Sequence, residues 1–107
     1  MRIYDMYGII DGSLEAAKTA IEQALNVHLV LHESSYIGEY YESGGVSEEN
    51  LVLRKNNDPF DNEPAELNFA EFPILFYVND TNQSELYQQK LLSEIETIKL
   101  LQRSVIE

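Results

Sequence analysis

The sequence contains no cysteine, and lysine and arginine together account for only seven of its 107 residues. Without cysteine, a disulfide framework, a thiolate metal site and a cysteine nucleophile are all excluded. No apolar run approaches the roughly 18 residues of a membrane-spanning helix. Acidic residues interrupt the apolar ones near the N-terminus, which disfavours a signal peptide. We therefore expect a soluble, cytoplasmic protein.

The scarcity of basic residues leaves a large negative charge. Nineteen acidic residues give a net charge of −12, and residues 33–71 hold ten of them against only two basic residues. Phosphate backbones and anionic lipids are repelled by such a chain, so direct binding to nucleic acid or membrane is not expected. A basic protein would be attracted. Solubility alone does not require this clustering.

Two segments show helical periodicity. The first lies between Ser13 and Asn26, which are residue types of a helix N-cap and of a C-terminal stop, and its apolar residues share one face. The second is expected from Ser84 to about Ser104. Its predicted inner stripe consists of Leu91, Ile95, Ile98, Leu101 and Val105.

β-branched and aromatic residues predict five strands, at residues 2–10, 27–33, 36–42, 51–55 and 72–78. Short connections, including a turn at Gly44-Gly45, favour an antiparallel meander. The last strand is the most apolar and is expected to be central. The order β-α-β-β-β-β-α predicts one α+β domain over residues 1–107. We expect a mostly antiparallel sheet of about five strands, with two helices packed on one face.

Catalysis has few candidate residues. His28 and His32 lie on one predicted strand, roughly 13 Å apart, too far to act easily on one substrate atom. No Gly-x-Ser-x-Gly elbow accompanies the nearby serines. The acids of residues 58–63 lack the central glycine of a calcium loop, and no lysine follows Gly44-Gly45 as in a phosphate-binding loop. We expect no catalysis, metal or cofactor; an enzyme would need a preformed pocket with perturbed pKa values.

Recognition of a protein fits the acidic middle of the chain better. Tyrosine gives a large contact area at little entropic cost, and Tyr40 and Tyr41 have glutamate neighbours instead of the basic groove that binds nucleic acid. The predicted loop of residues 56–71 is long for a structureless connection, and such loops are often functional. The partner-binding residues that we predict are Glu39, Tyr41, Glu42, Glu48, Glu49, Asp58, Asp61 and Glu63, with Tyr41 as an aromatic anchor.

The run SSYIGEYY, followed by ENLVLRKN and then by FPILFYV, resembles immunity proteins of bacterial contact-dependent growth inhibition and related polymorphic toxin systems. This resemblance, over roughly residues 21–79, implies a non-catalytic inhibitor of a toxin's C-terminal domain. Such toxins are often nucleases, which need a basic cleft for their substrate. No contact residue is carried over, because contacts vary between members. The alternative is a small acidic regulatory or adaptor domain that binds another protein.

Overall fold

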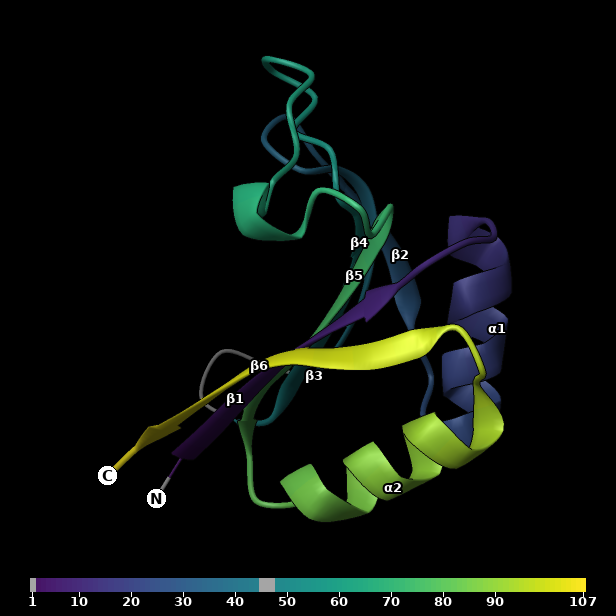
Figure 1. Ribbon diagram of the computed structural model, residues 1–107, viewed down its shortest axis with the longest axis vertical. Coiled ribbons are helices and arrows are strands. Elements are labelled where there is room, and N and C mark those ends of the chain that lie inside the picture. Colours follow the sequence, from purple (N-terminus) through teal and green to yellow (C-terminus); the bar gives the residue numbers. More distant parts are fainter. Residues whose placement is uncertain (1, 45–47) are drawn as a thin grey trace.

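Over residues 2–44 and 48–107, which the computed structural model describes, the chain forms one antiparallel sheet of six strands with two helices on one face (Figure 1). The predicted α+β class is confirmed, with one strand more than expected. In chain order the elements are β1 (Arg2–Ile9), α1 (Leu14–Leu25), β2 (Val30–Ser34), β3 (Gly38–Gly44), β4 (Asn50–Lys55), the 3-10 helix η1 (Leu67–Phe69), β5 (Ile74–Thr81), α2 (Ser84–Glu94) and β6 (Ile98–Ile106). Of the predicted Gly44-Gly45 turn, Gly45 lies outside the described residues.

The first strand of the chain lies inside the sheet. The strand order is β2-β3-β4-β5-β1-β6, so β1 has β5 and β6 as its neighbours. Strands β2 to β5 are consecutive neighbours and antiparallel, which confirms the predicted meander. β5 has a strand on each side, as expected for the most apolar segment.

Helix α1 begins and ends where its sequence predicts. Ser13 Oγ accepts a hydrogen bond from Ala16 N at 3.0 Å, which satisfies one of the unpaired amides of the first turn. Asn26 has a φ of 57°, the left-handed conformation that ends many helices. The two caps therefore set the first and last residues of the helix that covers the sheet.

The second helix is only half as long as predicted. α2 ends at Glu94, Ile95 is extended, and β6 then pairs antiparallel with β1. Leu91 and Ile98 are buried, but Val105, at the end of the expected stripe, is 52% exposed. Without β6, the outer edge of β1 would leave backbone N–H and C=O groups unpaired. The hydrogen bonds between β6 and β1 therefore outweigh the helical spacing of the apolar residues in this segment.

The second and third strands also begin later than predicted. Leu29 N donates a hydrogen bond to the Glu22 carboxylate at 2.9 Å, so the chain stays attached to α1 until Val30. Ser34 Oγ accepts a hydrogen bond from Tyr36 N at 3.1 Å, and this turn delays β3 by two residues. The bounds of the other predicted strands differ from those observed by at most three residues.

The core lies between the sheet and the two helices. Alternate residues of each strand face the helices, and Tyr7, Leu53 and Phe76 lie side by side in paired register on β1, β4 and β5. All three are completely buried, as are Ile21 of α1 and Leu91 of α2. This packing supplies most of the apolar burial that stabilises the fold.

A buried carboxylate joins three elements at the edge of this core. Asp5 of β1 is 2% exposed. Its Oδ1 accepts a hydrogen bond from Arg103 Nε of β6 at 2.8 Å, and its Oδ2 accepts one from Ser84 Oγ of α2 at 2.5 Å. Arg103 also donates to Gln88 at 2.8 Å. The hydrogen bonds to Asp5 raise the pKa of Arg103, so the guanidinium stays charged.

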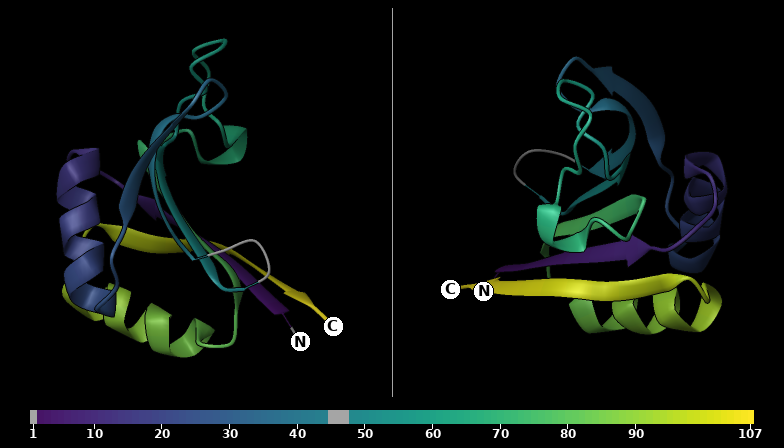
Figure 2. Two further views of the ribbon diagram at one scale, coloured as in Figure 1. Left: turned by 180° about the vertical axis from the view of Figure 1, so that it is seen from behind. Right: turned by 45° about the horizontal axis from the view of Figure 1, so that its top comes forward.

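The other face of the sheet is partly covered by residues 56–73, including η1 (Figure 2). The buried Asn56 side chain donates to the carbonyl oxygens of Phe69 and Phe72, each at 2.9 Å, and accepts from Glu66 N at 2.9 Å. Phe72 packs over Gly8, where an added Cβ would lie 2.6 Å from the phenylalanine ring. The two ends of this segment, at Asn56 and at Phe72, are therefore fixed against the sheet.

We predict that Asn56→Ala lowers the free energy of unfolding by about 2–4 kcal/mol, because it leaves two carbonyl oxygens and one amide without their partner. The neighbouring Asn57 is exposed, so Asn57→Ala is a matched control that we expect to change stability by less than about 0.5 kcal/mol. Urea unfolding measures both. Equal effects of the two substitutions would contradict the assigned role of Asn56.

Candidate functional site

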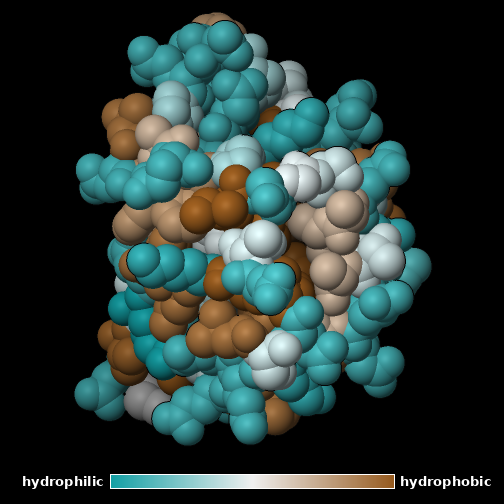
Figure 3. Space-filling view, turned by 45° about the vertical axis from the view of Figure 1, so that its right-hand side comes forward, coloured by the Kyte–Doolittle hydropathy of each residue, from teal (hydrophilic) through white to brown (hydrophobic). Residues whose placement is uncertain are grey.

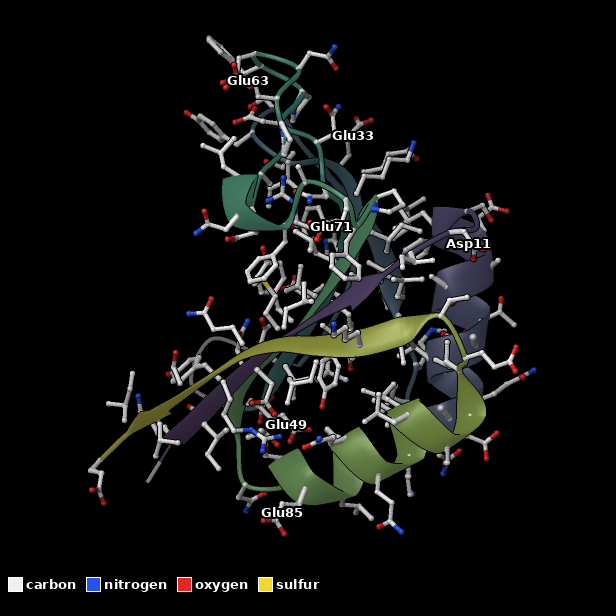
Figure 4. The ribbon with its side chains drawn as sticks, viewed as in Figure 1. Asp11, Glu33, Glu49, Glu63, Glu71 and Glu85 are labelled. Carbon is white, nitrogen blue, oxygen red and sulfur yellow. The ribbon has the colours of Figure 1, made fainter. Side chains whose placement is uncertain are left out.

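The eight predicted partner-binding residues do not form one surface. One group lies near one end of the long axis of the molecule, where Figure 4 places Glu63 and Glu33. Asp58 and Asp61 are hydrogen-bonded to the backbone of Glu63, and Glu39 is directly opposite Glu33 on the neighbouring strand. A second group lies toward the opposite end and consists of Glu42, Glu48 and Glu49. Figure 4 shows Glu63 and Glu33 at the first end and Glu49 at the other. Tyr41 lies near the first group, because it lines the same open hollow as Glu39.

We call the first end the tip. It comprises residues 33–39, which include the β2–β3 turn, and residues 56–66, which follow β4. The two segments meet where a Cβ added to Gly38 would lie 3.9 Å from Cγ of Pro59. In the space-filling view, hydrophilic side chains gather at this upper end (Figure 3). The tip therefore combines two loops that are about twenty residues apart in the sequence.

The carboxylates of the tip are not neutralised by the chain itself. Within the described residues, several of the tip's carboxylates take part in no salt bridge; these are Glu33, Glu39, Asp58, Asp61 and Glu63. Glu33 and Glu39 are directly opposite each other on β2 and β3, and like charges in such positions repel. The tip thus keeps a local repulsion that a cationic partner would relieve.

Two aromatic side chains project from the tip, and the sequence reasoning missed both as site residues. Tyr36 is 79% exposed and Phe60 is 88% exposed. The sequence could have predicted the exposure of Phe60, because the residue lies within Asp-Pro-Phe-Asp-Asn. This is a turn sequence, in which Phe60 belongs to no buried face of a strand or helix. Large exposed aromatic residues beside acidic ones are typical of a protein-binding surface.

Asp58 organises the loop that carries Phe60. Its backbone N donates to the carbonyl oxygen of Glu63 at 2.7 Å, and its own carbonyl oxygen accepts from Asn62 N at 2.8 Å. Its carboxylate accepts from Phe60 N at 2.9 Å. Asp61 adds a carboxylate bond to Glu63 N at 3.1 Å. Residues 58–63 therefore form a closed loop with a defined backbone.

The second acidic group is largely engaged within the chain. Glu49, between β3 and β4, accepts hydrogen bonds from Thr81 Oγ1 at 2.6 Å and from Tyr87 Oη at 2.8 Å. Burial and the hydrogen bond to Glu49 raise the pKa of Tyr87 to about 12, so the phenol remains a donor. Glu42 accepts from Asn50 at 2.9 Å. Glu48 is exposed. Its neighbour Glu49 is the residue that contacts α2, through the hydroxyl of Tyr87.

Tyr41 contacts the core on one side and an open hollow on the other, and its role as an anchor stays a prediction. It is half-buried and packs against the hydrophobic core, and Nζ of Lys18 lies 5.7 Å from its ring centroid. Tyr40 is on the other face of the sheet, where its ring stacks on His32 with centroids 5.4 Å apart. The tyrosines of β3 therefore contribute to packing on both faces of the sheet.

The histidines and the acidic side chains of the described residues do not converge on a metal site. His28 lies 3.4 Å from Glu22, and His32 lies 3.8 Å from Glu42, so the two histidines belong to separate pairs. Among residues 2–44 and 48–107, no three His, Cys, Asp or Glu side chains are grouped to hold a metal ion. An open hollow of about 610 Å³ lies beside the tip, and its lining includes Lys55 and two of the predicted partner-binding residues, Glu39 and Tyr41.

Neither helix in the part of the chain that the structure describes is both long enough and apolar enough to cross a membrane. No known family model matches this chain, and no curated protein was found to be similar to it.

The internal role of Glu49 leads to a stability prediction. Glu49→Ala removes the acceptor of two hydrogen bonds from half-buried or buried hydroxyls, and we expect the free energy of unfolding to fall by about 2–3 kcal/mol. Glu48→Ala changes an exposed neighbour and should alter stability by less than about 0.5 kcal/mol. Chemical denaturation of both variants tests this. A Glu49 variant as stable as the Glu48 variant would show that the carboxylate is dispensable.

Proposed function

We propose that this chain is an immunity protein of a contact-dependent growth inhibition or related polymorphic toxin system. In this proposal it binds the toxic C-terminal domain of an effector in the cytosol and neutralises it by contact, without catalysis of its own. The resemblance of residues 21–79 to such proteins supports the class of function. The net charge of −12 supports a basic partner.

The observation that carries the proposal is the tip. It brings together four predicted residues, Glu39, Asp58, Asp61 and Glu63, with two aromatic side chains that are more than three-quarters exposed. Acidic residues give attraction and specificity for a basic surface, and aromatic residues give contact area. A stable monomer needs neither an uncompensated like-charge pair nor an exposed phenylalanine at this position.

A nuclease is the toxin class that fits this surface best. A nuclease must attract a phosphate backbone, so its substrate cleft is lined with lysine and arginine. The acidic tip presents carboxylates to the same cationic groups, and fast association follows from their long-range attraction. The opposed carboxylates of Glu33 and Glu39 would gain cationic partners on binding. The same charge disfavours nucleic acid as a direct partner.

The proposal predicts that the tip controls the rate of association. The double variant Glu33→Lys/Glu63→Lys reverses two exposed charges at the tip. We expect it to slow association with the toxin domain encoded directly upstream by about tenfold or more at low salt, and to weaken the salt dependence. The double variant Glu94→Lys/Glu96→Lys makes the same change in net charge on exposed residues outside the tip. Stopped-flow or surface-plasmon measurements at two salt concentrations compare them.

The outcomes separate the candidate functions. Tight binding that weakens with salt, with a larger loss for the tip variant than for its control, supports an immunity protein that docks through the tip. If both variants lose affinity equally, the inhibitor function stands and the tip is not its docking surface. If the unsubstituted chain does not bind the upstream-encoded domain, the immunity proposal fails for that pair, and an acidic regulatory or adaptor domain becomes the leading function.

A further inference from the structure

Phe60 is set apart from the other phenylalanines of the chain. Phe72 and Phe76 are buried, Phe69 is half-buried, and Phe60 alone of the four is exposed, with 88% of its surface accessible. Exposure of so large an apolar side chain brings no stability to the folded monomer. The neighbouring segment carries a second exposed aromatic residue, Tyr36, and the two segments meet at Gly38 and Pro59.

The loop that presents Phe60 is already in a fixed conformation. Three hydrogen bonds close residues 58–63: the Asp58 N–H donates one, and the Asp58 carbonyl and carboxylate accept the other two. The Asp61 carboxylate accepts a fourth. Pro59 restricts its own φ, and Asn62 adopts a φ of 59°. Such a loop loses little backbone conformational entropy when a partner covers it.

We infer that Phe60 is an insertion residue, which enters an apolar pocket on the basic face of the toxin domain while the surrounding carboxylates pair with lysine and arginine at the rim of that pocket. This inference rests on the proposed function and adds to it how the partner is held. The carboxylates around Phe60 are Asp58, Asp61 and Glu63, so the rim and the centre of the contact come from one loop.

The charges around Phe60 select the kind of partner. A second copy of this chain would bring a second acidic tip toward the first, and the two would repel each other. An anionic lipid surface would be repelled in the same way. A basic protein surface is attracted and can also bury the ring. An apolar centre with a charged rim is the usual arrangement of a protein interface.

The inference predicts different kinetic effects for the centre and the rim of the contact. Phe60→Ala should raise the dissociation rate from the upstream-encoded toxin domain by about 30-fold or more and change the association rate by less than about threefold. The charge-reversed tip variant should instead act mainly on association. Leu67→Ala, on η1, is the matched control, because Leu67 is apolar and 70% exposed but lies outside the closed loop.

The role of Asp58 can be tested through the same rates. Asp58→Asn keeps an oxygen that can accept from Phe60 N and removes one charge, so association should slow while dissociation changes little. Asp58→Ala removes the acceptor as well, frees the loop, and should speed dissociation by about tenfold. Thermal unfolding of each variant checks that the fold is retained.

If Phe60→Ala dissociates at the unsubstituted rate while the charge-reversed variant associates slowly, the insertion role is wrong and the proposed function stands. An equal effect of Leu67→Ala also overturns the insertion role. If the unsubstituted chain does not bind the toxin domain, both the proposed function and the insertion role fail.

Discussion

The buried carboxylate of Asp5 sets the arrangement on which the rest of the sheet depends. Asp5 lies on the strand that has both β5 and β6 as neighbours, and it is paired in register with Arg103. A buried charge without a partner is strongly destabilising, so β6 has to lie where its arginine reaches β1. The bond from Ser84 then fixes where α2 begins. One side chain thus positions an edge strand and a helix.

The acidic residues of the chain differ in what they contact. Some are structural: Asp5 and Glu49 accept hydrogen bonds from residues far away in the sequence, and Glu22 accepts one from Leu29, just after its own helix. Others, among them Glu33 and Glu63, have no salt bridge within the described residues and lie at the tip. The net charge therefore combines acidic residues that hold the fold together with exposed ones, and the exposed ones at the tip are those that we propose to steer the partner.

Local features were predictable from the sequence, and features that depend on distant residues were not. The caps of α1 and the central place of β5 follow from residue type and apolarity. β6 was missed because Leu91, Ile95 and Ile98 also fit a helix, and the deciding partner, Asp5, is 98 residues from Arg103. The bonds of Glu49 extend 32 and 38 residues along the chain. Tip residues were partly foreseen, because acids and turn sequences are local signals.

The position of β1 has a consequence for how the chain is made. β1 is synthesised well before its two neighbours in the sheet, because β5 and β6 follow it in the sequence, with α1 and the strands β2 to β4 between β1 and β5. At about 5–20 residues per second, the ribosome takes several seconds to reach β5 after β1 has emerged. During that time β1 has neither neighbour, and the tip loop lacks the carbonyl of Pro73, to which Asn56 N donates. The sheet over the described residues can therefore form in full only once β6 has been synthesised, and a chain interrupted before Pro73 contains the acidic residues of the tip without the contact to that residue.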